Sequence, residues 1–416
     1  MRISARKLKK SLSEEILKKA KSIGEICMES GYPCYLVGGT VRDIILKVPQ
    51  IDIDIVTEGN IKLFGDVSKK LKIKKITLSQ FNTAKLLFND GCSIDIAQAR
   101  KETYQYPASL PVVRRSSIHE DVKRRDFTIN TLLMGITKND FGKIYDYLGG
   151  IEDIEKGIIR ALHKNSFIDD PTRIFRAFRF KERFSFRFHR RTKTLIDNAI
   201  RSGVIKKLSP QRIRKELFLL LKERRWNKIV LSLSRNGILQ ELGIKNELNR
   251  VPINSFEKKI NDYINIKRNW ELSKLLLITE YANGKEIKTF SQRVGLKKKE
   301  SMLLLELRKG RKRILTTLSR KEVSNKEIYW LLTSLPLDAL IYLLSKATSQ
   351  SRKGILLYLN DLKNIKIKIK GDDLKKLGIK AGPIYKKILQ KLLDEKLNGK
   401  LKFKREEIEF VKRQFK

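Results

Sequence analysis

Hydrophobic and polar positions follow two different patterns along the chain. Between residue 12 and about residue 160, a helical stretch, SEEILKKAKSIGEICMES, precedes short runs that alternate or are rich in β-branched residues: CYLV, IDIDIVT, KKITL, AKLLF and CSIDIAQA. Alternation with period two is typical of strands, and apolar residues three or four apart are typical of amphipathic helices. This part of the chain therefore predicts an α/β domain.

The pattern changes beyond about residue 165. Leu, Ile, Lys and Arg recur there at helical spacing almost to the last residue, and Val-rich alternation disappears. Apolar stripes of this kind predict helices that bury one face. We therefore expect the second part of the chain to be all-α.

The composition of the chain indicates what kind of partner it binds. The 416 residues are 41% hydrophobic, enough for two to four folded modules, and 91 Lys and Arg against 46 Asp and Glu give a formal charge of +45. A surface this basic predicts a polyanionic partner, and phosphate backbones attract it strongly. An anionic membrane surface would attract it too, but no apolar run approaches the roughly 20 residues of a membrane span.

The first residues and the cysteine and histidine content indicate where the protein acts and which kinds of site it lacks. MRISARKLKKSLSEE lacks the apolar centre of a signal peptide, so we expect a cytoplasmic protein without a membrane. The cysteines form no CxxC pair and the histidines are scattered, which predicts reduced thiols and no His-rich metal centre. These residues are Cys27, Cys34, Cys92, His119, His163 and His189.

Two aspartates in IDIDIV carry candidate chemistry. On a strand, Ile51, Ile53 and Ile55 face one side and Asp52 and Asp54 the other, roughly 7 Å apart along the strand. Paired carboxylates suit Mg²⁺, and two such ions could activate a hydroxyl and stabilise a leaving pyrophosphate. Taken alone, the same pattern is also typical of a solvent-facing strand.

The residues before this pair make the metal interpretation more specific. A short apolar strand, YLV, is followed by Gly38 and Gly39, which permit close backbone approach, and then by a predicted helix, TVRDIIL, that carries Arg42. The amides at such a helix start point to where a triphosphate could lie. Strand, paired glycine, arginine and paired aspartate in this order favour nucleotidyl transfer over an ordinary turn.

Two later motifs add polar side chains. RRDFTINTLLM predicts a helix with Asp126 near its cap and Asn130 one turn on, although Asp126 could serve only as a cap. In DDPTRIFRAFRFKER, Pro171 suits the first position of a helix. That helix places arginines on one face and apolar side chains on another: Arg173, Arg176 and Arg179 against Ile174, Phe175 and Phe178.

Together these motifs resemble the class II tRNA nucleotidyltransferase and bacterial poly(A) polymerase family, a branch of the polymerase-β-like nucleotidyltransferases. LVGGTVRDIIL, IDIDIVTEGN, RRDFTINTLLM, DYLGGIEDIEKGIIRAL and DDPTRIFRAFRFKERFSF carry the resemblance, which covers at least residues 31–220. It implies an elongated protein whose catalytic head (1–145) contains a mixed sheet. A helical neck with base recognition (146–225), a body (226–330) and an RNA-binding tail (331–416) would follow.

The resemblance also implies roles for single residues. Asp52 and Asp54 would hold two catalytic Mg²⁺ ions, and Asp95, in the similar strand SIDIA, could add a third carboxylate or simply lie on a polar strand face. The remaining head residues would contact the sugar and the triphosphate of the nucleotide. These are Gly38, Gly39, Arg42, Arg124, Arg125, Asp126 and Asn130.

Base selection would fall to DDPTR. Cytosine and adenine both present an exocyclic amine beside an unprotonated ring nitrogen, so a carboxylate and a guanidinium can recognise either, while uracil and guanine would leave them unmatched. The resemblance assigns this to Asp170 and Arg173, with Arg176 and Arg179 toward the nucleotide. Asp169 stands where the family has a longer glutamate.

These features predict an enzyme that adds C and A, or A alone, to the 3′ end of tRNA from CTP and ATP, without a nucleic-acid template. Within the family, ARKETYQYP (99–107) resembles enzymes that add only the terminal A more than full CCA-adding enzymes. LSPQRIRKELFLLL (208–221) would support the neck, and LKKLGIKAGPIYKKILQKLL (374–393) would belong to the tRNA-binding tail. A poly(A) polymerase and a non-catalytic RNA-binding protein on this fold remain the alternatives.

Overall fold

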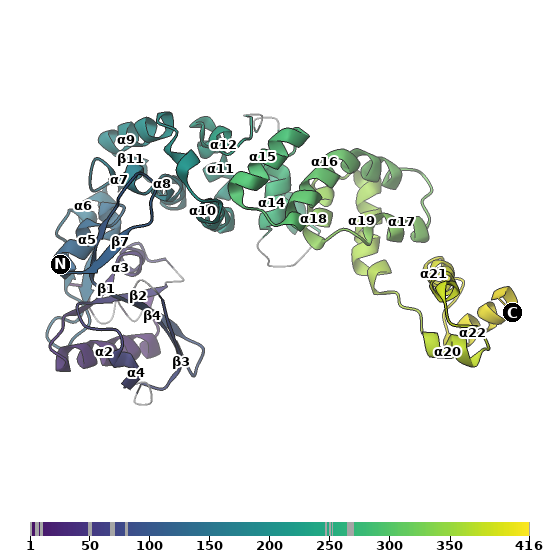
Figure 1. Cartoon of the computed structure of the whole chain (residues 1–416), viewed down its shortest axis with the longest axis horizontal. Helices are drawn as coiled ribbons and strands as arrows, with labels where there is room; N and C mark the ends of the chain where they lie inside the picture. Colours follow the sequence, from purple (N-terminus) through teal and green to yellow (C-terminus); the bar gives the residue numbers. More distant parts are fainter. Residues whose placement is uncertain are drawn as a thin grey trace. The chain divides into compact units, whose positions relative to one another are not determined.

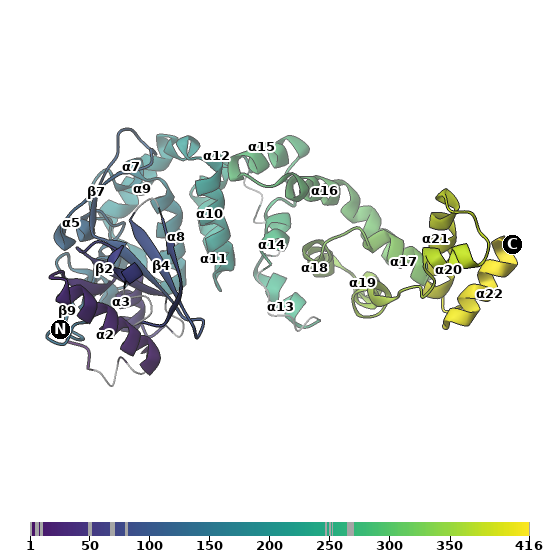
Figure 2. The same cartoon turned by 60° about the horizontal axis from the view of Figure 1, so that its bottom comes forward.

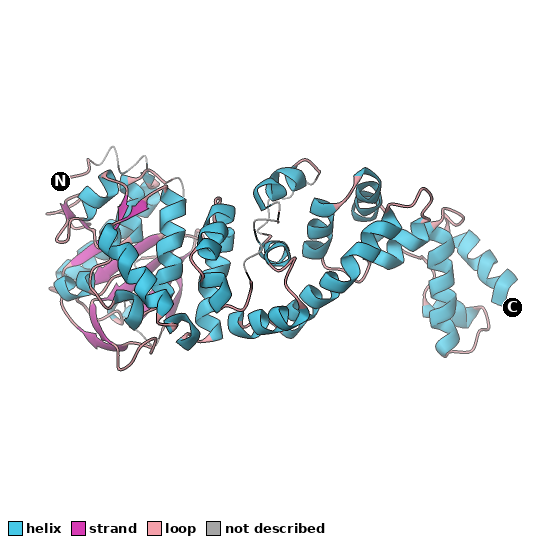
Figure 3. Cartoon of the chain, turned by 90° about the horizontal axis from the view of Figure 1, so that it is seen from above, coloured by secondary structure: helices cyan, strands magenta, loops and turns pink. Residues whose placement is uncertain are grey.

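The computed structural model describes residues 2–4, 8, 11–48, 52–66, 71–79, 82–245, 248, 251, 253–263 and 270–415. The chain forms two compact units, Met1–Glu241 and Leu242–Lys416. Among the described residues the strands lie in the first unit, drawn in magenta in Figure 3. The finer division into head, neck, body and tail stays a prediction.

A seven-stranded mixed sheet forms the centre of the first unit. Only β2 and β5 run parallel, and the other neighbours in the sheet pair antiparallel. The strands in spatial order are β3 (Ile73–Leu78), β4 (Thr83–Phe88), β5 (Ser93–Gln98), β2 (Ile53–Thr57), β1 (Cys34–Val37), β8 (Leu133–Gly135) and β9 (Ile144–Tyr145). The mixed sheet confirms the fold class expected for this part of the chain.

Alternation in the strands sorts side chains between the two faces of the sheet. In β2, Ile53 and Ile55 are buried while Asp54 between them stays partly accessible, as the pattern predicts. The helix α2 (Glu14–Glu29), capped by Ser13, packs its apolar face on the sheet (Figures 1 and 2). Ile51, expected to share the face of Ile53, lies outside the described residues.

The segment RRDFTINTLLM differs from the helix expected for it. Only a short 3₁₀ turn, η1 (Thr128–Asn130), forms before β8, and β8 pairs with the free edge of β1, opposite Tyr35, Leu36 and Val37. Continuing the helix would leave that edge of β1 without backbone partners. Asp126 does not cap a helix, but Asn130 Nδ2 donates to its Oδ1 at 2.8 Å, so the two side chains still lie together.

The rest of the first unit is mostly helical. The helix α8 (Thr172–Phe184) starts one residue after Pro171 and buries Ile174, Phe175 and Phe178, as expected. The other helices are α3 (Gly39–Ile45), α4 (Leu63–Asp66), α5 (Ile118–Lys123), α6 (Gly150–Glu155), α7 (Ser166–Asp169), α9 (Arg190–Arg201), η2 (Val204–Lys207), α10 (Pro210–Lys222), α11 (Trp226–Arg235) and α12 (Ile238–Glu241).

Two small sheets flank the main one in the first unit. The strands β6 (Arg100–Thr103) and β7 (Val112–Arg115) form an antiparallel ribbon. The strands β10 (Ile158–Ile159) and β11 (Arg187–Phe188) pair in parallel. Because β11 lies beyond residue 165, the expectation of a purely helical second part is wrong at these two residues.

In the described residues of the second unit, all the regular structure is helical. Its elements are η4 (Ile253–Ser255), α13 (Phe256–Asn261), α14 (Glu271–Ile278), α15 (Gly284–Val294), α16 (Lys298–Leu318), α17 (Asn325–Leu332), α18 (Leu337–Lys346), α19 (Ser349–Asn360), η5 (Leu362–Asn364), α20 (Gly371–Lys376), α21 (Pro383–Leu397) and α22 (Lys404–Phe415). The last three helices share a small core of Ile369, Leu374, Ile388, Leu392, Leu401 and Val411.

Neither membrane spans nor disulfides appear in the described residues. No single helix there has the length and apolarity of a membrane span, and α17 with α18 would pass such a test only as a pair bent by 117°. Cys27, Cys34 and Cys92 are free thiols, as predicted.

Candidate active site

The two strands that run in parallel bring two of the three expected carboxylates together. Asp54 on β2 and Asp95 on β5 are directly paired, so their side chains share one face of the sheet. Asp52 is exposed and precedes β2 by one residue, so the expectation that both aspartates of IDIDI lie within the strand is wrong for Asp52. Asp95 forms an ion pair of 3.3 Å with Lys85 on β4.

The carboxylate of Asp54 has a shifted pKa. Burial raises its pKa from 3.8 to about 6, and the charges of Asp95 and Asp52 add to this, while Arg125 opposes it. A divalent cation would remove that repulsion, and oxygen donors are the ligands Mg²⁺ prefers. The residues therefore fit Mg²⁺, although no group of three acidic, His or Cys side chains among the described residues is already gathered around one point.

The paired glycines lie directly against this carboxylate. Gly38 has φ of +60°, and a Cβ there would come 2.6 Å from Nη1 of Arg125. A Cβ on Gly39 would lie 3.6 Å from Nη2 of Arg42 and 3.8 Å from Oδ2 of Asp54. The two glycines thus leave room for the guanidinium groups of Arg125 and Arg42 close to the glycine turn, with Asp54 beside Gly39.

Thr40 fixes the glycine turn to the strand that carries Asp54. Its hydroxyl donates to the carbonyl of Asp52 and accepts from the N–H of Asp54, both at 2.8 Å, and its side chain is fully buried. The sequence analysis did not single out Thr40. Its position directly after the two glycines was the available signal, since a hydroxyl can satisfy both a donor and an acceptor.

Arg42 is buried and does not extend into solvent. Its Nε donates to Oδ1 of Asp43 at 2.8 Å, its Nη1 donates to the side chain of Asn130, and its guanidinium lies 4.8 Å from the ring centroids of Phe180 and Phe184. Burial lowers its pKa, and the carboxylate of Asp43 opposes that. Arg42 thus connects the glycine turn to both later motifs.

Asp121 positions the arginine pair of RRDFT and was missed by the sequence analysis. This fully buried carboxylate accepts two nitrogens from each arginine: Arg124 on Oδ1, at 2.9 and 2.7 Å, and Arg125 on Oδ2, at 3.2 and 2.7 Å. Burial raises its pKa, but the charges of Arg125 and Arg124 outweigh this, so the pKa is lowered. The signal was its spacing, three and four residues before the arginines on one helical turn.

Asp126 connects this motif to α8. Nε of Arg176 donates to its Oδ2 at 2.7 Å, while Asn130 binds the other oxygen. Burial would raise its pKa, but the charge of Arg176 and the bond from Asn130 lower it to about 2. Asp126 therefore stays ionised and holds one basic residue of α8 in place.

Hydrogen bonds from neighbouring groups position the two residues expected to read the base, Asp170 and Arg173. Asp170 accepts at Oδ1 from the N–H of Thr172 (3.0 Å), from its hydroxyl (2.5 Å) and from Nη2 of Arg212 (2.6 Å). No described residue donates to Oδ2, which stays available as an acceptor. Arg173 donates to the carbonyl of Arg124 at 2.7 Å and to Ser166 at 2.8 Å.

Arg212 and His163 are further residues that the sequence analysis did not place here. Arg212 lies on α10, which we expected only to support the neck, and its Nη1 also donates to the carbonyl of Ala108 at 2.7 Å. Nε2 of His163 is 3.3 Å from Nη1 of Arg173. Burial raises the pKa of Asp169, and nearby His163 opposes the rise. Charged groups thus surround Asp170 and Arg173, the two residues expected to read the base.

Arg179 does not join the groups around Asp54. Its guanidinium lies 3.6 Å from Glu216 and 3.8 Å from Glu223, too far for good hydrogen bonds, and its buried Nε has no hydrogen-bond partner among the described residues. Arg179 therefore faces α10, and its expected role at the nucleotide stays a prediction. The other expected residues form one connected set from Asp54 to Asp170, and a cleft of about 530 Å³ lined by Asp54, Asp95 and Arg125 opens at one end.

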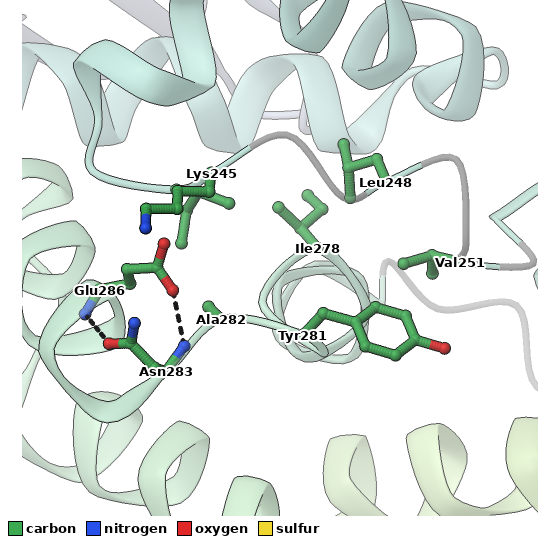
Figure 4. A pocket seen from close by; sticks show the side chains of 9 residues that line it. Lys245, Leu248, Val251, Ile278, Tyr281, Ala282, Asn283 and Glu286 are labelled. Carbon is green, nitrogen blue, oxygen red and sulfur yellow. Dashed lines mark hydrogen bonds between the residues drawn. The ribbon is translucent and has the colours of Figure 1, made fainter.

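A second cavity, of about 150 Å³, lies within the second unit (Figure 4). Its walls combine apolar side chains such as Ile278 and Tyr281 with the polar side chains of Lys245, Asn283 and Glu286. Its acidic group, Glu286, accepts the N–H of Asn283 and completes the cap of α15. Asn283 and Glu286 therefore serve the start of a helix.

Comparison with known proteins agrees with this geometry. Residues 34–160 match the model of the poly(A) polymerase head domain. An A-adding tRNA nucleotidyltransferase of Halalkalibacterium halodurans is 30% identical over 424 residues, covering 97% of this chain and 94% of the relative. The chain belongs to the tRNA nucleotidyltransferase and poly(A) polymerase family. The resemblance predicted from the motifs is thereby confirmed.

Other members of the tRNA nucleotidyltransferase and poly(A) polymerase family are similar over most of this chain. An A-adding tRNA nucleotidyltransferase of Geobacter sulfurreducens is 35% identical over 397 residues and covers 91% of this chain. The chain spans only 45% of the length of that relative. The solved structure of the Thermotoga maritima CCA-adding enzyme complexed with tRNA is 29% identical, with a TM-score of 0.72, and the match covers 99% of this chain and 98% of that one.

Proposed function

We propose that the protein is a nucleotidyltransferase that adds 3′-terminal nucleotides to tRNA, and that it adds the terminal A alone. One observation carries the catalytic part: Asp54 and Asp95 are paired across parallel strands, with Gly39, Arg42 and Arg125 directly beside them. The names of relatives from Halalkalibacterium halodurans and Geobacter sulfurreducens support addition of A. The T. maritima complex supports tRNA as the substrate.

Mg²⁺, held by Asp52 and Asp54 with Asp95 beside them, would supply positive charge for an in-line displacement. In this reaction the 3′-hydroxyl oxygen of the RNA bonds to the α-phosphorus of the nucleotide, and pyrophosphate leaves. Arg42 and Arg125 would neutralise the triphosphate next to the glycine turn. Asp126 and Asn130, already hydrogen-bonded to each other, would orient the ribose.

Base choice would depend on one free oxygen. Oδ1 of Asp170 is saturated by Thr172 and Arg212, so Oδ2 is left to accept a hydrogen bond from the exocyclic amine of the incoming base. Arg173 is held by Ser166 and the carbonyl of Arg124, and its guanidinium would donate to a ring nitrogen of the base. A keto base would leave both groups unpaired, and this mismatch would reject it.

The test uses the purified chain, Mg²⁺, labelled ATP or CTP, and two tRNAs that end after the first or the second C of the CCA end. An A-adding enzyme extends only the second tRNA, by one nucleotide, with ATP. Extension of the first tRNA by CTP would make it a CCA-adding enzyme. No incorporation of either nucleotide would overturn the proposal.

The match to the poly(A) polymerase head favours one second candidate, a poly(A) polymerase. Such an enzyme would add many adenylates to unstructured RNA as well as to tRNA, so product length on the two substrates separates the functions. A non-catalytic RNA-binding role predicts instead that Asp52→Ala combined with Asp54→Ala leaves the RNA-related activity unchanged. A cytoplasmic location stays a prediction.

A further inference from the structure

The outer face of the β6–β7 ribbon breaks a rule of strand pairing. Lys101 on β6 lies directly opposite Arg114 on β7, and both side chains are exposed. Like charges in this position destabilise a strand pair. Neither cation has an ion-pair partner among the described residues, and Glu120, whose pKa responds to Lys101, pairs with Lys123 at 2.9 Å. On the inner face Arg100 also lies opposite an arginine, Arg115, but there Glu102 forms an ion pair with Arg100 at 2.7 Å.

The turn that joins the two strands presents an exposed aromatic ring. Tyr106 and Leu110 are each 65% exposed, and Val112 at the start of β7 is 39% exposed. An exposed apolar residue alone needs no explanation. Here, however, the aromatic ring and the unpaired cations occupy one short ribbon, and aromatic stacking beside basic side chains is the chemistry by which proteins bind single-stranded nucleic acid.

The same turn is anchored beside the base-reading carboxylate. Ala108, with φ of +65°, donates its N–H to the carbonyl of Ile168 at 3.1 Å and accepts from Nη1 of Arg212 at 2.7 Å. The other nitrogen of Arg212 binds Asp170. Tyr106 is therefore only two residues from a backbone group that shares its arginine with Asp170.

We propose that the outer face of this ribbon, made of Lys101, Thr103, Val112 and Arg114 with Tyr106 at the turn, binds the single-stranded 3′ end of the RNA substrate. The two cations contact phosphates, whose charge removes their repulsion, and Tyr106 stacks on a base. This inference rests on the proposed function, because the RNA must bring its 3′ end to the site of Asp54 and Asp170.

The test exploits the repulsion. Two variants are made separately, Lys101→Glu and Arg114→Glu. Each turns the like-charge pair into an opposite-charge pair, so the protein should unfold at an unchanged or higher temperature. RNA binding, by contrast, should weaken. We expect the KM for tRNA to rise about tenfold, the KM for ATP to change less than twofold, and the slope of log KM against log salt to fall by about 0.7, the value for one single-strand phosphate contact.

The control is Lys18→Glu, which makes the same change of charge on the exposed face of α2, away from β7 in Figures 1 and 2. It should leave the KM for tRNA close to that of the unmodified protein. Tyr106→Ala should raise that KM at least fivefold, and Tyr106→Phe should not, because a phenyl ring still stacks. Equal effects of Lys101→Glu and Lys18→Glu would overturn the ribbon proposal.

Direct binding separates this inference from the proposed function. A fluorescent RNA oligonucleotide ending in CC is titrated with each protein, without ATP. If the unmodified protein adds no nucleotide to tRNA but Lys101→Glu weakens oligonucleotide binding, the function fails and the ribbon proposal stands. If oligonucleotide binding is unchanged while binding to anionic lipid vesicles or to an acidic peptide is lost, the ribbon serves another partner and the proposal is wrong.

Discussion

Replacing Asp54 by asparagine should stabilise the metal-free protein while abolishing nucleotide transfer. The carboxylate is partly buried, faces Asp95, and has its pKa raised from 3.8 to about 6. Asparagine has nearly the same shape but no charge to desolvate. The group that would bind the metal is therefore one that the fold, without metal, holds at a cost.

The size of the stability gain follows from the shift in the pKa of Asp54. A rise of about two units corresponds to about 3 kcal/mol when the group is fully ionised in both states, at about 1.4 kcal/mol per unit. Because the folded state binds the proton more tightly than the unfolded state, this carboxylate lowers stability as pH rises from below 3.8 to above 6. The gain from Asp54→Asn should be close to zero below pH 3.8 and about 2 to 3 kcal/mol at pH 8.

The assay is unfolding of the first unit in EDTA, followed by calorimetry between pH 4 and pH 8, for the unmodified chain and Asp54→Asn. The matched control is Asp52→Asn, whose carboxylate is exposed and so gives burial no reason to stabilise the variant. Both variants should lose nucleotide transfer. A stability gain for Asp54→Asn that does not grow with pH, or an equal gain for Asp52→Asn, would refute the reasoning.

Three further predictions follow from contacts in the same site. Asp121→Asn should raise the KM for ATP at least tenfold, because it releases Arg124 and Arg125. The control is Asp153→Asn, which is equally buried and bound to Arg160 by two bonds of 2.8 Å, and which should leave that KM unchanged. Equal effects of the two substitutions would contradict a positioning role for Asp121. Arg212→Gln should lower the preference for ATP over GTP, measured as the ratio of the two kcat/KM values, by about tenfold, because Asp170 loses a charged donor at Oδ1. An equal loss of kcat/KM for both nucleotides would show that Arg212 only supports the fold. Gly38→Ala should lower activity at least tenfold because its Cβ, 2.6 Å from Nη1 of Arg125, would displace that guanidinium from the triphosphate. Gly149→Ala, with φ of +74° and open space around the Cβ, should cost about 1 kcal/mol of stability and no activity; a fully active Gly38→Ala would contradict this.

The sequence predicted those parts of the fold that follow from local pattern. Alternation in IDIDIV and SIDIA correctly indicated the strands Ile53–Thr57 and Ser93–Gln98, although Asp52 lies before the first of them. The spacing of apolar residues in DDPTRIFRAFRFKER correctly indicated an amphipathic helix. RRDFTINTLLM was misassigned because its last residues pair with β1, a contact that depends on a strand almost a hundred residues earlier. The local sequence pattern does not indicate that the backbone groups at the free edge of β1 must pair with another strand.

The site could be predicted as a set of residues more readily than as a set of contacts. Asp52, Asp54 and the glycine pair come from motifs, but Thr40, Asp121 and Arg212 act through neighbours that only the folded chain brings close. Arg212 shows the reason, since its two partners, Ala108 and Asp170, lie 104 and 42 residues away. Sequence spacing on α10 alone suggests nothing beyond an amphipathic helix.

The helix α8 fixes the spacing between three separate contacts. Arg173 reaches the carbonyl of Arg124, Arg176 reaches Asp126, and Arg179 faces Glu216, each three residues and about 4.5 Å further along one rigid axis. Inserting or deleting a single residue here would rotate every later contact by about 100°. We therefore expect related sequences to keep the length of α8 constant, because a change of length would separate these three contacts from their partners.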